Sequence, residues 1–289
     1  MGLLSKTGFK PVLSIRLFKL ITMARLKGNV LFTGSLGNIS AYTRKGSDAI
    51  ILRTKGGASK ERIKKAPEFA NTRKANTEFG GASTTAKNIK LAMSGLTHLD
   101  HSLFQSKLNA ICSSILKLDT AGVWGQRAIL ISHYRHLLEG FNLEMGTPFD
   151  SIVKHPLRCN INRADQSASI VVPALFPGIG LYIPGNFQFF RLIAVLGIVP
   201  DMNYDTKFNQ YRPVNSAIQL KRADLYTDWF SSAAICNEQN LVLQIQGETG
   251  ITDNDSLQLS IGIEFGVQVS AALINPVNYA GAAKILALA

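Results

Sequence analysis

Residues 257–265 read Leu-Gln-Leu-Ser-Ile-Gly-Ile-Glu-Phe, an almost strict alternation of apolar and polar residues. A period of two places the apolar side chains on one face of a β-strand. The stretch therefore predicts a strand with one buried face. Similar short apolar runs, separated by Pro, Gly, Asn and Asp, fill the chain after Pro156. They are residues 168–172, 187–198, 216–220, 241–245, 257–265 and 283–288.

Strands at this spacing over roughly 130 residues are typical of two packed antiparallel sheets. We therefore predict an immunoglobulin-like antiparallel β-sandwich over residues 157–289. The chain before it contains a different signal: apolar residues recur every three to five positions from Leu96 to Leu118. That spacing predicts a helix packed in a core rather than a cofactor site. The fold class expected is α+β, with a boundary near residues 145–165.

The first 90 residues hold most of the positive charge. They contain 18 of the 31 Lys and Arg but only 4 of the 19 Asp and Glu, and the whole chain carries a formal charge of +12. Such segregation predicts attraction to a polyanion or to an acidic protein face, although exposed basic residues also serve simply to solvate a surface. Most of this charge lies between Met23 and Lys90, and we expect residues 23–150 to form a basic ribbon followed by a helical domain.

Two short strands flank Lys45-Gly46-Ser47-Asp48, a hairpin-loop composition. In this ribbon Tyr42, Arg44 and Arg53 share one face. A helix capped by Ser59 follows, and a second is expected from Pro67 to Phe79, ended by Gly80-Gly81. The side chains predicted to contact a polyanion or partner are Tyr42, Arg44, Lys45, Arg53, Lys55, Lys60, Arg62, Lys64, Lys65, Arg73 and Lys74.

Enzymatic motifs are missing from the sequence. It has no phosphate-binding glycine loop, since Gly178-Ile179-Gly180 lacks the third glycine of the dinucleotide pattern, and it has no G-x-S-x-G elbow. No cofactor is expected, and no catalytic residue is identified. Four histidines fall in i,i+3 pairs and are the candidates for a metal site, although the H-E-x-x-H pattern is missing. They are His98, His101, His133 and His136.

Three cysteines, Cys112, Cys159 and Cys236, are far apart and show no C-x-x-C spacing. An odd number without metal-ligand spacing argues against a disulfide framework and favours a reducing compartment. Cys112 falls on the apolar helical stripe, where a thiol behaves as a small buried hydrophobe. We expect a cytoplasmic protein or a subunit of an assembled particle or filament.

Several short motifs along the chain together indicate a resemblance to a protein family. The chain contains G-x-L-G-N-I-S-x-Y, then K-G-S-D, then R-T-K-G-G-x-S-K-E-x-I-K-K-x-P-x-F, then N-T-R and E-F-G-G, and in its C-terminal part P-V-N-Y-A-G-x-A-K at residues 276–284. In these motifs it resembles an uncharacterised family of bacterial hypothetical proteins, some encoded near phage-like or mobile-element regions. The resemblance covers most of the chain and implies no catalytic residues. It favours a structural or assembly role.

Residues 1–22 contain Lys and Arg but no acid, and we interpret them as a basic leader or an upstream extension. No apolar run is long enough for a transmembrane helix. The function expected is a non-enzymatic structural or assembly protein, forming homo-oligomers or larger assemblies through the basic N-terminal region. A nucleic-acid-binding protein that contacts DNA or RNA without sequence specificity is the alternative. A metal-dependent enzyme is the lesser one.

Overall fold

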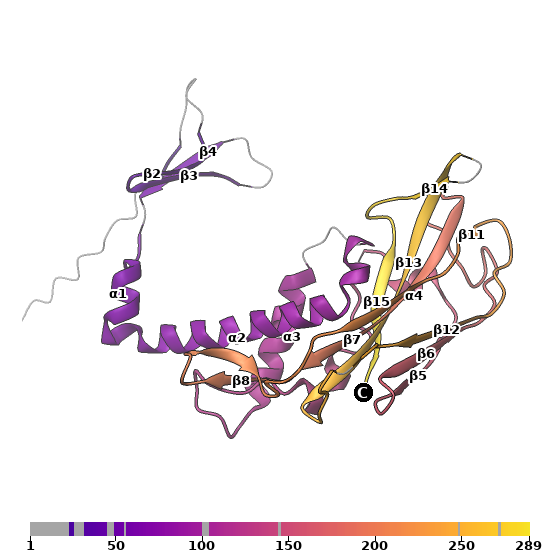
Figure 1. Ribbon diagram of the computed structural model, residues 1–289. Coiled ribbons are helices and arrows are strands. Elements are labelled where there is room, and N and C mark those ends of the chain that lie inside the picture. Colours follow the sequence, from indigo (N-terminus) through magenta and orange to yellow (C-terminus); the bar gives the residue numbers. More distant parts are fainter. Residues whose placement is uncertain are drawn as a thin grey trace, which may run out of the picture. The chain divides into compact units, whose positions relative to one another are not determined.

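The computed structural model (Figure 1) describes residues 32–44, 49–54, 56–99, 104–143, 146–247, 249–270 and 273–289, and the backbone of residues 23–25. Contacts divide the chain into two compact units, Met1–Ala66 and Pro67–Ala289. The division falls where Pro67 begins a new helical segment. The boundary expected near residues 145–165 lies inside the second unit.

The first unit contains a four-stranded antiparallel sheet in the order β1-β4-β3-β2. Its strands are β1 (Met23–Arg25), β2 (Gly34–Leu36), β3 (Ile39–Thr43) and β4 (Ile50–Thr54). Strands β3 and β4 pair with Tyr42 opposite Ile51 and Ser40 opposite Arg53. Tyr42 and Arg53 therefore share one face, as the alternation of side chains predicted.

Helix α1 (Lys60–Lys65) begins at Ser59, whose hydroxyl accepts a hydrogen bond from the backbone N–H of Arg62 at 3.2 Å. This is the expected capping contact, because Ser supplies an acceptor for a helix N–H that has no partner within the helix. The helix ends at Ala66, before Pro67. A proline disfavours helical backbone at the residue before it, which fits this end point.

Helix α2 (Ala70–Ala92) follows a short 3₁₀ turn, η1 (Pro67–Phe69). The expected end at Gly80-Gly81 is wrong, because the helix continues through both glycines. Gly81 is required for packing rather than for termination. The ring of Tyr211 lies so close that a Cβ on Gly81 would come within 2.6 Å of it.

The helical layer is completed by η2 (Ser94–Leu99) and α3 (Phe104–Leu118). A single helix from Leu96 to Leu118 was expected, whereas η2 and α3 are separate elements. Helix α3 buries Leu108, Cys112 and Ile115, so the predicted core stripe is confirmed there. After α3 the chain forms two 3₁₀ turns, η3 (Ile131–His133) and η4 (Arg135–Leu137), and the short helix α4 (Phe149–Ile152).

The central element of the second unit is a six-stranded antiparallel sheet with the core order β10-β7-β13-β14. Strand β11 also pairs with β7, and β15 pairs with β13. The strands are β7 (Phe189–Pro200), β10 (Arg222–Tyr226), β11 (Phe230–Ser231), β13 (Asp255–Ser270), β14 (Leu273–Pro276) and β15 (Ala282–Leu288). The protein is thus α+β, with a multistranded antiparallel sheet in its C-terminal half.

Residues 216–220 do not form the strand expected there. Asn215 turns the chain, since its side chain accepts a hydrogen bond from Ala217 N–H and donates to the carbonyl of Gly250 and to Asp255. Local side-chain hydrogen bonds of this kind compete with strand formation. The strand begins instead at Arg222.

Two smaller sheets complete the second unit. One has the order β12-β6-β5 and the other is the β8-β9 hairpin. Their strands are β5 (Arg158–Asn162), β6 (Ser167–Val172), β8 (Met202–Asp205), β9 (Gln210–Pro213) and β12 (Gln239–Gln244). Ile170 of β6 and Leu241 of β12 share one hydrophobic cluster with Leu259 and Ile261 of β13. The three-stranded sheet therefore contributes to the core on one side of β13.

Strand β13 is buried on both faces from Asp255 to Gly266, so the expectation of a single buried face is wrong. The helical layer covers its polar face. Gln258 donates to the carbonyl of Ile89 in α2 at 3.4 Å, and Gly262 lies against Leu96 of η2. In Figure 1 helices α2 and α3 lie beside β7, and they share a hydrophobic cluster with β7 and β15.

Candidate functional site

The predicted basic ribbon places Tyr42 and Arg53 in contact. The Arg53 guanidinium carbon lies 5.5 Å from the centre of the Tyr42 ring, which is a cation–π distance. Arg44 is exposed beyond the end of β3. Lys45 and Lys55 lie outside the described residues. The part of the ribbon that is described therefore presents an aromatic ring and a guanidinium on one face.

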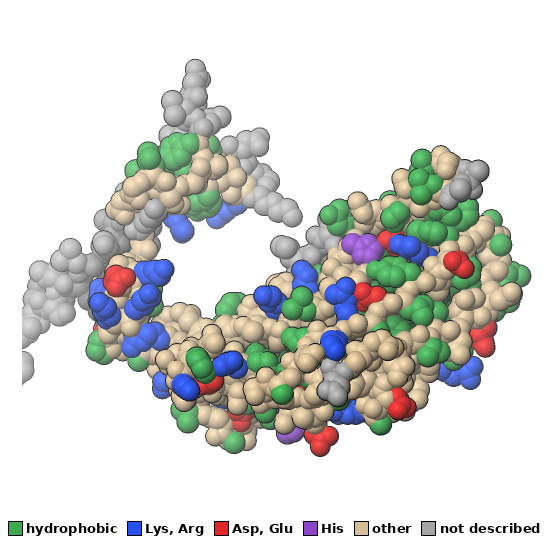
Figure 2. All heavy atoms as spheres, viewed as in Figure 1, with side chains coloured by type: hydrophobic (Ala, Val, Ile, Leu, Met, Phe, Trp, Pro, Cys, Tyr) green, Lys and Arg blue, Asp and Glu red, His purple; other side chains and the backbone are tan. Residues whose placement is uncertain are grey.

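Helix α1 presents four further predicted residues, and the helix has no buried residue. Figure 2 shows basic side chains gathered around this helix. All four are exposed: Lys60, Arg62, Lys64 and Lys65. Exposed lysines and arginines on a short helix suit contact with a polyanion, but they are equally typical of a solvated surface.

Arg73 and Lys74 belong to the second unit, in the first turns of α2. The Lys74 ammonium lies 5.3 Å from the centre of the Trp124 ring, and its aliphatic stem packs against Gly125. Part of Lys74 therefore covers the loop after α3. This is the usual behaviour of a long basic side chain, whose stem packs while its charged end stays near solvent.

The opposite face of the N-terminal sheet is apolar. The register places Ile39, Ala41 and Leu52 on one face, together with Leu36 of the outer strand β2. Leu36 is 68% exposed and Ile39 is 41% exposed. Among the described residues of this unit, only Ala41 and Ile50 are buried hydrophobics. The sheet thus has an apolar face that is exposed at Leu36 and Ile39 and buried at Ala41 and Ile50, and a second face with Tyr42 and Arg53.

Of the candidate metal-binding histidines, His98 has a defined partner. Its Nε2 lies 2.7 Å from Oε1 of Glu264 on β13, a buried carboxylate whose side chain is 2% exposed. His101 lies outside the described residues. His133 contacts the ring of Tyr134, and His136 lies in η4. In the described part of the chain, no group of three or more His, Cys, Asp and Glu side chains is arranged to hold a metal ion.

Glu264 has a second partner in Arg191, its cross-strand neighbour on β7. Arg191 Nε donates to Oε2 of Glu264 at 2.5 Å. Burial by itself raises the pKa of Glu264, but the hydrogen bonds from His98 and Arg191 hold that pKa below its ordinary value of 4.5. Glu264 is therefore an ionised carboxylate in the protein interior at neutral pH.

Two aromatic rings pack against the guanidinium of Arg191 beside Glu264. Its Cζ lies 4.9 Å from the centre of the Tyr226 ring and 4.6 Å from the centre of the Trp229 ring. Neither Arg191 nor Glu264 is among the site residues predicted from the sequence. Glu264 was the one charged residue in an otherwise uncharged strand pattern, and that was a signal for a buried ion pair.

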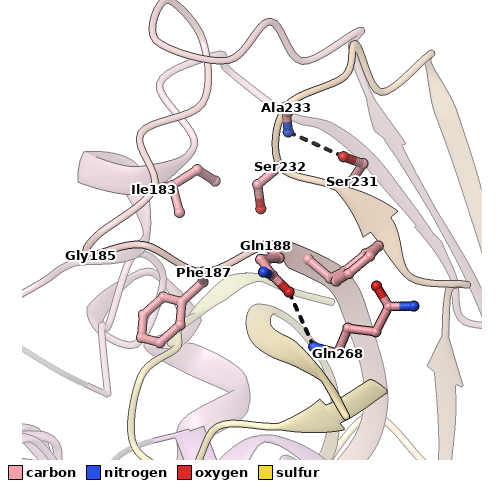
Figure 3. Close-up of a pocket in the computed structure, with 9 residues that line it drawn as sticks. Ile183, Gly185, Phe187, Gln188, Ser231, Ser232, Ala233 and Gln268 are labelled. Atoms are coloured by element: carbon pink, nitrogen blue, oxygen red, sulfur yellow. Dashed lines mark hydrogen bonds between the residues drawn. The ribbon is translucent and has the colours of Figure 1, made fainter. Parts of the chain in front are cut away.

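A surface cavity of about 460 Å³ lies at the end of the six-stranded sheet (Figure 3). Its polar groups bond to one another: Gln188 accepts from the backbone of Gln268 at 3.4 Å, and Ser231 accepts from Ala233 at 3.3 Å. The hydroxyl of Ser232 is buried and has no hydrogen-bond partner. None of the described side chains that line this cavity is titratable.

A second cavity, of about 490 Å³, is lined by α2, η2 and α3. Two basic residues, Lys87 and Lys90, line it beside the hydroxyls of Ser83, Thr84 and Thr97. The Lys90 ammonium lies 5.1 Å from the centre of the Phe104 ring. None of the described residues that line this cavity is acidic. Its charge suits an anion, but the hydroxyls of Thr84 and Thr97 already donate to backbone carbonyls.

Within the described residues, no helix combines the length and the apolar character needed to cross a bilayer. No protein-family model matches the sequence, and neither the curated proteins nor the solved structures that were searched contain a match.

Proposed function

We propose that this protein is a non-enzymatic structural subunit that assembles with copies of itself through its N-terminal unit. In this proposal residues 157–289, with the immunoglobulin-like sandwich expected for them, form part of the body of each subunit. One observation supports the proposal most directly. The N-terminal sheet exposes Leu36 and Ile39 on the same face, beside only two buried hydrophobic side chains among its described residues.

A small sheet of this kind gains little stability by itself. Folding costs about 1–2 kcal/mol of backbone entropy per residue, and apolar burial returns about 25 cal/mol per Å². Domains that are too small to build a sufficient core often depend on oligomerisation. Covering Leu36, Ile39 and Leu52 with a neighbouring subunit would provide the missing apolar burial.

The outer strands offer a second mode of association. Strands β1 and β2 lie at the two edges of the sheet order. An edge strand has backbone N–H and C=O groups available to pair with a strand of another chain. Edge pairing and burial of the apolar face are compatible, because the first uses the backbone and the second uses side chains.

The test is a pair of arginine substitutions, one in β3 and one in the neighbouring strand β2. Ile39→Arg places a charge on the apolar face, and Ser35→Arg places it on the opposite face of β2, since Ser35 pairs with Ser40. Size-exclusion chromatography with light scattering should show oligomers for the wild type and for Ser35→Arg, and a shift to monomer for Ile39→Arg. A monomeric wild type at all concentrations, or equal oligomers for both variants, would contradict the proposal.

The second candidate is a nucleic-acid-binding protein, and the pairing of Tyr42 with Arg53 favours it. A base can stack on a partly exposed tyrosine such as Tyr42 while nearby arginines contact phosphates. The basic side chains of α1 would add sequence-independent phosphate contacts. Replacing Lys60, Arg62, Lys64 and Lys65 by glutamine should then weaken DNA or RNA binding and reduce its salt dependence. Oligomers that are insensitive to salt and bind no nucleic acid would support assembly instead.

A further inference from the structure

We infer that Arg191, held between Tyr226 and Trp229, is the receptor of a binding site for a carboxylate or phosphate group on the second unit. Five segments supply this site: η2, β7, β10, the turn between β10 and β11, and β13. All of its residues belong to the second unit, so the inference does not depend on the assembly proposal.

The orientation of the guanidinium is fixed from two directions. Its Nε donates to Glu264 at 2.5 Å, and the Tyr226 and Trp229 rings lie 4.9 and 4.6 Å from its Cζ. Glu264 is held in turn by His98 Nε2 at 2.7 Å. A side chain that is fixed before binding loses less conformational entropy when a ligand arrives. Arg191 is therefore prepared for binding rather than free to move.

The outer edge of the guanidinium remains available. Only Nε of Arg191 is used by Glu264, and its two Nη groups have no hydrogen-bond partner among the described residues. The side chain is 24% exposed, so this edge reaches solvent. Two parallel N–H groups match the two oxygens of a carboxylate or phosphate, and such paired charge-assisted bonds are strong and directional.

The surrounding charges permit an anion. Glu264 is buried beneath Arg191, with a side-chain exposure of 2%, and its two oxygens are already occupied. Burial and the negative charge of Asp224 raise the pKa of the Tyr226 hydroxyl, so Asp224 also lies near the site. Arg222 pairs with Asp224 at 2.9 Å. Glu264 and Asp224 are thus each neutralised by a cationic partner. His98, the other partner of Glu264, is 39% exposed and adds no negative charge to the site.

Trp229 provides the readout. The chain has two tryptophans, Trp124 and Trp229, so a Trp124→Phe variant leaves Trp229 as the sole reporter. Inorganic phosphate and succinate are titrated separately, each against sodium chloride at matched ionic strength. We expect a saturable change in Trp229 fluorescence with a Kd in the millimolar range, roughly that of a single small charged group. A larger response to one of the two identifies which oxyanion the site prefers.

Arg191→Lys keeps the positive charge but removes the two parallel Nη–H donors. It should weaken oxyanion binding at least about tenfold. Arg212→Lys is the matched control, because Arg212 also lies over an aromatic ring, 4.5 Å from the centre of Phe208, but has no buried carboxylate behind it. Circular dichroism establishes that each variant folds. The inference fails if Arg191→Lys binds as the wild type does, or if chloride produces the same change. It also fails if neither oxyanion gives a saturable signal with the Trp124→Phe protein, which requires no change at Arg191.

Discussion

The ring of Tyr211 packs against the backbone of helix α2 at Gly81. A Cβ at Gly81 would come within 2.6 Å of the ring, whereas a Cβ at Gly80 would meet nothing within 4 Å. The Tyr211 hydroxyl also donates to the carbonyl of Arg127 at 2.8 Å. This contact joins the β8-β9 hairpin to the helical layer and explains why a glycine occurs at position 81 inside the helix.

The two glycines should therefore respond oppositely to alanine. Gly81→Ala forces Tyr211 away and should lower the free energy of unfolding by about 1–3 kcal/mol. Gly80→Ala should raise it by up to about 1 kcal/mol, because alanine favours the helix. Urea denaturation followed by circular dichroism measures both. Equal effects of the two changes would contradict the packing role of Gly81.

Glu78 of α2 should be important for stability. Its carboxylate accepts two hydrogen bonds from Arg127, each at 2.7 Å, and one from Gly125 N–H at 2.8 Å. Glu78→Ala leaves Arg127 unpaired and should cost about 3 kcal/mol, the lower end for a buried pair because Arg127 is partly exposed. Glu238→Ala, at an exposed position, is the control and should change stability by less than about 0.5 kcal/mol.

Ionised Glu264 should stabilise the folded protein, and this stabilisation should be lost at acidic pH. Although burial raises its pKa, the hydrogen bonds from His98 and Arg191 hold the pKa below 4.5. A depressed carboxyl pKa stabilises the fold above the ordinary value, and this contribution is lost as the pH falls through the folded value. Glu264→Gln should therefore reduce the pH dependence of unfolding below about pH 5, by up to about 1.4 kcal/mol per pH unit. Parallel curves for the variant and the wild type would exclude this role.

Asp201 should change the free energy of unfolding with pH in the opposite direction from Glu264. Burial raises the pKa of Asp201 above its ordinary value of 3.8, even though the backbone and hydroxyl of Ser132 donate hydrogen bonds to it. The contribution of a raised group is present below the unfolded pKa and lost as the pH rises through the folded value. Asp201→Asn keeps the bond from Ser132 N–H, so its stability relative to the wild type should increase as the pH rises above about 4. Thermal unfolding at a series of pH values measures this, and a constant difference would contradict it.

The cysteines should differ in reactivity. Cys112 is buried in α3, and burial raises the pKa of its thiol to about 12. Cys159 of β5 is exposed, whereas Cys236 is buried. Iodoacetamide should label Cys159 in the folded protein, and Cys159→Ser should remove that labelling. Mass spectrometry should find Cys112 modified only after unfolding, because the thiolate is the reactive form.

The sequence by itself determined most of the local structure. Period-two alternation predicted the pairing of Tyr42 and Arg53 on one face, and the apolar runs predicted β6, β7, β12, β13 and β15. Ser59 and Pro67 predicted the limits of α1, because capping and the restricted backbone before proline act over a few residues. The exposure of the basic residues of α1 was also predictable, because closely spaced charged side chains are rarely buried.

Only the tertiary structure decided what those elements pack against. The polar positions of β13 predicted a solvent-facing side, yet Gln258 and Glu264 are buried because the helical layer covers them and supplies their partners. Gly80-Gly81 predicted a helix end, yet the ring of Tyr211, distant in sequence, uses the space at Gly81. The site at Arg191 joins segments separated by up to 166 residues, from His98 to Glu264. A local pattern reports burial and turn preferences, whereas partners brought together by packing depend on contacts that have no local signal.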